Sequence, residues 1–136
     1  MSPAPFVVRL GPGEPFAVLA DSVRTGGVLG VVACTWAPGT EPPPHTMVRA
    51  DRALVVTSGA VRMRVGEEEY DAGPDDLVFV PRGHRLAVRA LEPSRATVVV
   101  TPAGAEAWLA AVAVPDLDPV TTLGIALDHG VNVHLR

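Results

Sequence analysis

Short apolar runs, separated by glycine and proline, fill the first hundred residues of this chain. Proline accounts for 14 and glycine for 13 of the 136 residues, so few stretches are long enough for a regular helix. Val61, Met63 and Val65 alternate with Arg62 and Arg64, which is the two-residue period of a strand with one buried face. The pattern is typical of a small antiparallel barrel or sandwich.

Most of the expected strands are only four to six residues long. They are Phe6–Leu10, Phe16–Ala20, Val28–Trp36, His45–Val48, Ala53–Thr57, Ala60–Val65, Glu68–Asp71, Leu77–Val80, Arg85–Ala90 and Ala96–Thr101.

After Thr101 the period changes to that of a helix. Residues 102–113 predict one helix, with Pro102 in its first turn and Trp108 placed to pack on the barrel. A second helix is expected from Asp118, which suits the N-cap, to Gly130, which suits the end. Its apolar stripe consists of Val120, Leu123 and Leu127. We therefore expect one domain over 1–136, with a barrel over about 5–101 and a helical tail over about 102–136.

Charge and cysteine content exclude several classes of protein. The net charge is -4 and no basic block exists, so nucleic acid is not an expected partner. Cys34 is the single cysteine, which excludes a disulfide framework within one chain and favours a buried, inert thiol. The first residues lack a secretory pattern and no run reaches ~18 apolar residues. We expect a cytoplasmic protein with no membrane partner.

The segment from Gly39 to Gly59, GTEPPPHTMVRADRALVVTSG, places His45, Met47 and Arg52 between two glycines, with gaps of five, one, four and six residues. It resembles the first motif of the cupin superfamily, in which two histidines and a glutamate stand at those three positions. The resemblance implies an all-β cupin fold, a double-stranded β-helix or jelly-roll barrel with a central pocket. Only the first of the three metal ligands is present.

A second segment, DAGPDDLVFVPRGHRLAVRA, resembles the second cupin motif, which supplies a fourth ligand histidine. Pro81 and Gly83 match, but His84 follows at once, and Leu86 falls at the histidine position by simple counting. The segments before and after the two motifs are similar to small single-domain cupins of the quercetin dioxygenase-like group. The likeness extends over nearly the whole chain, and it implies a homodimer, since small cupins often pair or exchange edge strands.

The substitutions argue against a metal cofactor. A mononuclear transition-metal centre needs several nitrogen and oxygen ligands facing one point, and Arg52 would place a fixed positive charge beside the cation. We therefore expect no metal and no other cofactor. If a metal is present, the expected site is a transition metal held by His45 and His84.

Without a metal, His45, Arg52 and His84 are the candidate catalytic residues. An unperturbed histidine has a pKa of about 6.5, so His45 is expected to exchange a proton near neutral pH. Arg52 would stabilise an enolate, carboxylate or phenolate. The structural alternatives are a hydrogen-bonded His45, an Arg52 paired with Asp51 or Glu41, and a His84 that faces solvent.

Strand parity predicts the lining of the pocket. If His45 and Arg52 point inward, the apolar face of each neighbouring strand points inward as well, which gives a hydrophobic tube with a few polar groups. Trp36 either walls this pocket or fills the barrel end, and Tyr70 either donates a proton or lies at the rim. The candidate substrate-binding residues are Trp36, Glu41, Met47, Leu54, Val56, Met63, Tyr70 and Phe79.

Three functions remain open. The first is a metal-independent biosynthetic enzyme, a cyclase, isomerase or dehydratase acting on a hydrophobic, polyketide-like or aromatic molecule; the resemblance contributes to this, since related small cupins often accompany natural-product pathways. The second is a metal-dependent oxygenase of the quercetin dioxygenase-like type. The third is a cupin that binds a small ligand without turnover.

Overall fold

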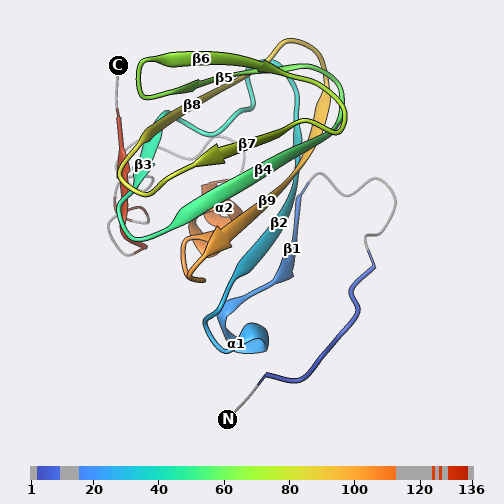
Figure 1. Ribbon diagram of the computed structural model, residues 1–136, viewed down its shortest axis with the longest axis vertical. Helices are drawn as coiled ribbons and strands as arrows, with labels where there is room; N and C mark the ends of the chain where they lie inside the picture. The colour runs from blue at the N-terminus through green and yellow to red at the C-terminus, as the bar shows by residue number, and fades with distance from the viewer. Residues whose placement is uncertain (1–2, 10–15, 113–123, 125, 127–128, 135–136) are drawn as a thin grey trace.

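Two five-stranded antiparallel sheets form the computed structural model of this chain, which describes residues 3–9, 16–112, 124, 126 and 129–134. The first sheet has the order β1-β2-β9-β4-β7, and the second has the order β10-β3-β8-β5-β6 (Figure 1). The strands of the first sheet are β1 (Phe16–Ala20), β2 (Gly30–Trp36), β9 (Ser94–Thr101), β4 (Asp51–Ser58) and β7 (Leu77–Val80). Those of the second are β10 (Val131–Val133), β3 (His45–Met47), β8 (Arg85–Ala90), β5 (Val61–Val65) and β6 (Glu68–Ala72).

The all-β architecture expected from the glycine and proline punctuation is confirmed, but the first expected strand is not. Residues 6–9 of the segment Phe6–Leu10 are exposed and belong to neither sheet. An extended segment becomes a strand only when a neighbour takes up its backbone hydrogen bonds, and the described residues offer this segment none.

A short helix that the sequence pattern does not indicate, α1 (Ser22–Thr25), follows β1. The Asp21 side chain accepts a hydrogen bond from the backbone of Arg24, and Gly26 ends the helix in the left-handed conformation with φ 66°. Asp21 therefore caps the N-terminus of α1 and Gly26 caps its C-terminus.

The expected helical tail requires correction. The first of the two helices expected in this tail is α2 (Glu106–Val112), which begins four residues after Pro102 and packs against β1 and β2. Trp108 is fully buried, as expected. The chain then returns to the barrel as strand β10, whose residues pair with β3, because β3 would otherwise present an unpaired edge. The expected second helix from Asp118 to Gly130 falls largely outside the described residues.

The inward faces of the two sheets form one apolar core. Val61, Met63 and Val65 are buried on the inner face of β5, as their alternation predicts, and Leu54 and Val56 are buried on β4. Cys34 is also buried, and burial raises the pKa of its thiol to about 12, so this thiol is unreactive near neutral pH. No helix of the described residues is long and apolar enough to cross a membrane.

Gly59, the last glycine of the first motif, is required by the close approach of two strands. Its φ is +88°, and a Cβ atom there would lie 2.2 Å from Ser94 Oγ and 2.6 Å from the carbonyl oxygen of Pro93. Only glycine fits this turn without moving the backbone at the start of β9. The turn ends β4 beside the start of β9, and the pairing of β4 with β9 and β7 points Arg52 inward.

Candidate functional site

His45 and Arg52 come from opposite sheets and meet inside the barrel. His45 begins β3 and is 1% exposed, whereas Arg52 is the second residue of β4 and is 2% exposed. Arg52 Nη1 lies 2.6 Å from His45 Nε2, within hydrogen-bond distance. The strands place the two side chains face to face across the core.

The hydrogen bonds of His45 determine its tautomer. A guanidinium group has only donors, so Nε2 must accept from Arg52. Nδ1 lies 2.8 Å from the carbonyl oxygen of Pro43, and because a carbonyl oxygen can only accept, Nδ1 must carry the proton. His45 is therefore a neutral imidazole with both nitrogens engaged.

The pKa of His45 corrects the expectation of a proton shuttle at neutral pH. Burial first, and then the charge of Arg52, lower this pKa from 6.5 to about 3, although the hydrogen bond to Pro43 opposes the shift. Burial lowers the pKa of Arg52 to about 10, which leaves it positively charged near neutral pH. In this closed arrangement Arg52 carries the charge and His45 orients it.

Arg52 has no carboxylate partner among the residues that the structure describes. The two partners considered from the sequence are both engaged elsewhere: Asp51 pairs with Arg82, and the Glu41 carboxylate accepts hydrogen bonds from the backbone of Gly39 and Ala90. A cation held inside a barrel without a counter-ion is costly. This cost is the most unusual feature of the core.

Two hydrogen-bond donors next to His45 are buried without an acceptor among the described residues. They are Arg52 Nε and the indole nitrogen Nε1 of Trp108. The Trp108 ring packs against the His45 ring with 4.5 Å between the centroids and 51° between the planes. Because buried polar groups are nearly always hydrogen-bonded, two such donors around one imidazole indicate a place for a group that accepts hydrogen bonds.

The side chains at the metal positions of the cupin motifs do not fit a transition metal. His45 supplies one nitrogen, but that nitrogen already accepts from Arg52. Met47 and Leu86 are buried, and Leu86 is the residue of β8 that pairs with His45, so the second motif delivers an aliphatic side chain. Across the described ranges, no group of three or more histidine, cysteine, aspartate or glutamate residues is placed to hold a metal.

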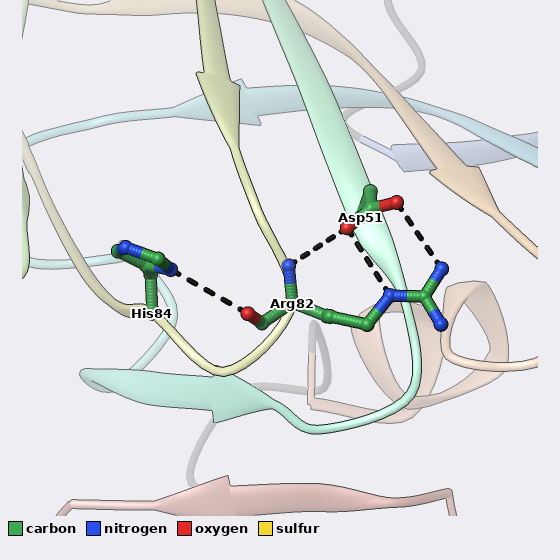
Figure 2. Close-up of polar contacts among 3 residues, drawn as sticks. All are labelled: Asp51, Arg82 and His84. Atoms are coloured by element: carbon green, nitrogen blue, oxygen red, sulfur yellow. Dashed lines mark hydrogen bonds and ion pairs between the residues drawn. The ribbon is translucent and has the colours of Figure 1, made fainter.

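His84 does not share a site with His45. It lies on the exposed turn between β7 and β8, where its Nδ1 is 3.4 Å from the carbonyl oxygen of Arg82. Figure 2 shows this turn, with the Arg82 backbone and guanidinium both donating to the Asp51 carboxylate. The shortened loop therefore points His84 outward and leaves Leu86 facing the core.

The candidate lining residues divide into two groups. Trp36, Met47, Leu54, Val56 and Met63 are buried in the core. The other three lie elsewhere. Tyr70 is opposite Met63 on the edge strand β6 but is 49% exposed, which fits a rim position. Phe79 is 57% exposed on the outer face of β7, and Glu41 is bound to backbone amides.

A cavity of about 210 Å³ opens beside Met47 at the end of the barrel that carries the start of α2. Met47 and Ala105 line this cavity and also belong to the buried core, and Ala105 lies three residues before Trp108. The cavity is lined by Met47, Arg49, Ala50, Pro102, Ala103, Gly104, Ala105, His129 and Gly130.

The contact between Trp108 and His45 could not be read from the motifs. The helical pattern places Trp108 on a helix that packs on the barrel, but more than sixty residues separate it from His45. The sequence indicates this contact only weakly, because a tryptophan in a helix that follows a barrel is usually a packing residue.

The sheet order, the inward-facing motif and the match of residues 32–102 to the cupin domain family show that this chain belongs to the cupin family. The match extends over more than half of the chain. Comparison with curated proteins gives no significant match.

Three solved structures illustrate the likeness of the fold. KdgF from Halomonas sp. is 24% identical, with a TM-score of 0.58 over 68% of this chain and 84% of that chain. The protein TT1209 from Thermus thermophilus is 27% identical, with a TM-score of 0.54 over 70% and 90% of the two chains. A variant of PAC13 from Streptomyces, solved with uridine, is 22% identical, with a TM-score of 0.56 over 64% and 68%.

Proposed function

We propose that this protein is a metal-independent cupin enzyme that binds a small organic molecule through an oxyanion, such as a carboxylate, enolate or phenolate. The observation that carries the proposal is the buried cation of Arg52, which has no counter-ion among the described residues and whose Nε has no acceptor. An oxygen anion would neutralise the charge and accept hydrogen bonds from the free donors. The cation stands where its metal-binding relatives are expected to hold a metal.

The binding step follows from the same contacts. An oxyanion beside Arg52 accepts from Nε, and a second lone pair accepts from the indole nitrogen of Trp108. His45 keeps Arg52 in place by accepting from Nη1, so the guanidinium is oriented before the ligand arrives. The walls of the core are aliphatic, which suits a hydrophobic or aromatic ligand body.

The chemistry that this arrangement supports is charge stabilisation. Arg52 would stabilise the negative charge that develops when a proton passes from a carbon next to a carbonyl group to water or to a basic group of the substrate itself, as in an isomerisation, dehydration or cyclisation. His45 is a positioning residue in this scheme, because both of its nitrogens are engaged and its pKa is about 3. A biosynthetic step on a hydrophobic intermediate is the proposed role.

A ligand-binding cupin without turnover is the second candidate, and the low pKa of His45 favours it. A proton-transfer enzyme needs a base that functions near neutral pH, and the closed core offers no such group among its described residues. Turnover of the bound molecule separates the two candidates, since both require Arg52 for binding.

Benzoate is a suitable probe, with benzamide as the matched neutral molecule of the same shape. We expect benzoate to bind the wild-type protein and to raise its melting temperature, because the carboxylate neutralises Arg52. Benzamide should bind far more weakly. The variant Arg52→Met should lose the preference for benzoate, whereas Arg82→Met, which removes an exposed arginine, should keep it.

Metal analysis completes the test. Protein purified without chelator should contain no stoichiometric transition metal, and benzoate binding should be unchanged by EDTA. A bound metal at one ion per chain, together with loss of binding after chelation, would overturn the proposal and favour the oxygenase.

A further inference from the structure

Four arginines gather on the outer face of the second sheet, where β8, β5 and β6 lie side by side (Figure 1). Arg62 and Arg89 are direct partners in the pairing of β5 with β8, and Arg64 faces Ala87, two residues from Arg85. The alternate residues of β5 are buried in the core, so its two arginines point to the outside of the barrel. The cluster forms only when the strands pair.

Two of these arginines, Arg64 and Arg85, have no carboxylate partner among the described residues. The strand pairing places Glu69 opposite Arg64, but the Glu69 carboxylate lies 3.1 Å from Arg62 Nε, and Arg62 also binds Asp71. Both outward-facing carboxylates of β6 are therefore engaged by Arg62. Arg64 and Arg85 are exposed, and their guanidinium donors are available to a ligand.

A groove of about 620 Å³ is bordered by these two arginines. Its lining consists of Arg64, Gly66, Glu67, Arg85 and Ala87. The Gly66 amide donates to the carbonyl oxygen of Arg85 at 2.8 Å, which holds the turn between β5 and β6 against β8. The small side chain of Ala87 leaves space beside Arg64, and the volume is in the range of sites for small organic molecules.

We propose that this groove binds a small molecule that carries a phosphate group and a hydroxyl group, such as a sugar phosphate. A guanidinium group donates two parallel hydrogen bonds to phosphate oxygens. Diagonal neighbours on paired strands lie ~7–8 Å apart, so Arg64 and Arg85 can reach one phosphate from two sides. The Glu67 carboxylate has no ion pair among the described residues, and as an acceptor it suits a hydroxyl group of the ligand.

The balance of charge favours a compact phosphate over a carboxylate or a long polyanion. A phosphate monoester carries about −1.5 to −2 charges near neutral pH, which matches two guanidinium groups, whereas a carboxylate neutralises only one. A polyanion lying across the sheet would meet the carboxylates of Glu67, Glu69 and Asp71 on the β6 side, and like charges repel.

Isothermal titration with ribose 5-phosphate, inorganic phosphate and ribose tests the proposal at low ionic strength, because salt screens exposed charges. We expect ribose 5-phosphate to bind more tightly than inorganic phosphate, and ribose to show no detectable binding. Arg64→Gln and Arg85→Gln should each weaken ribose 5-phosphate binding about tenfold, because each removes a charge-assisted contact. The matched control Arg95→Gln removes an exposed arginine of the first sheet and should leave the affinity unchanged.

Two further measurements locate the ligand in the groove. In amide NMR spectra of the wild-type protein, the signals of Gly66 and Ala87 should shift when ribose 5-phosphate is added. Glu67→Ala should bind inorganic phosphate at least as tightly as the wild type, because a like charge is removed, and should lose the preference for ribose 5-phosphate. Thermal melts verify that each variant is folded.

This site lies outside the barrel and does not depend on the oxyanion site at Arg52. Arg52→Met should therefore bind ribose 5-phosphate as the wild type does, and Arg64→Gln should keep the preference for benzoate. Three results would each overturn the proposal: no binding of ribose 5-phosphate by the wild type, equal affinities for ribose 5-phosphate and inorganic phosphate, or a loss of affinity in Arg95→Gln as large as in Arg64→Gln.

Discussion

Strand β4 holds two adjacent charged residues with opposite surroundings, Asp51 and Arg52. Asp51 faces outward and pairs with Arg82, whose guanidinium is exposed and whose pKa is raised mainly by its hydrogen bond to Asp51. Arg52 faces inward, has no carboxylate among the described residues, and has its pKa lowered by burial. The first pair has charge compensation and solvent, and the second group has neither.

The comparison shows where function is expected. An exposed ion pair contributes little to stability, because water already solvates both charges. A buried cation without a counter-ion lowers stability, and a protein gains by keeping one only where the charge has another use. The inner arginine is therefore the better functional candidate, although the outer one has more contacts.

The largest expected effect comes from Arg52→Met. The charge-assisted hydrogen bond from Arg52 Nε to the oxyanion and the neutralising charge are both lost, so benzoate affinity should fall on the order of a hundredfold. The free energy of unfolding should stay unchanged or rise, because removal of the desolvated charge offsets the acceptor left free on His45. Isothermal titration and urea unfolding measure the two quantities. Wild-type benzoate affinity together with a large loss in the free energy of unfolding would assign Arg52 a structural role.

The second effect is a loss of stability in acid that depends on His45. The folded pKa of about 3 lies below the ordinary 6.5, so between these pH values the unfolded chain binds a proton that the folded chain does not. The free energy of unfolding should therefore fall as the pH falls through this window.

Urea unfolding at a series of pH values measures this slope in three proteins. His45→Gln should show a shallower dependence on pH than the wild type, whereas His84→Gln should follow the wild type. Equal slopes for the wild type and His45→Gln would mean that His45 is solvated, in conflict with its buried position.

A smaller effect is expected from Trp108→Phe, which removes the indole donor and keeps an aromatic ring. Benzoate affinity should fall about tenfold, since one hydrogen bond is lost. The free energy of unfolding should change by less than about 1.5 kcal/mol, because the lost N–H has no partner among the residues that the structure describes. An unchanged affinity would show that the oxyanion does not reach the indole.

The smallest effect is expected from Asp51→Asn on the outer side of the same strand. The pair that it breaks is exposed, so the melting temperature should hardly change and benzoate affinity should equal that of the wild type. Titration and thermal melts of this variant beside Arg52→Met measure the contrast directly. A loss of benzoate affinity as large as that of Arg52→Met would show that the two faces of β4 are not independent.

The barrel could be predicted from the sequence because alternation and turn residues are local signals. Val61, Met63 and Val65 face the core as their period requires, and the same two-residue period in β4 buries Arg52. Residues 6–9 stay outside both sheets and β10 joins the second sheet. Which segment pairs depends on which strand edges are free, and this is a property of the assembled sheets.

The site was predictable only in part. The motif spacing indicated that His45 and Arg52 point inward, but the pKa of His45 depends on burial and on a contact between two sheets. The outward direction of His84 follows from the geometry of the turn at Gly83, and the contact of Trp108 with His45 depends on how α2 docks. These features arise from tertiary packing and have no local pattern.

The most direct test of a guanidinium at the centre of this barrel is the ¹⁵N NMR spectrum of the His45 imidazole at neutral pH. The structure predicts a protonated Nδ1, and an Nε2 that lacks a proton and is coupled through a hydrogen bond to the Arg52 side chain. A proton on Nε2, or a shift of that nitrogen that disappears when a chelator is added, would contradict it.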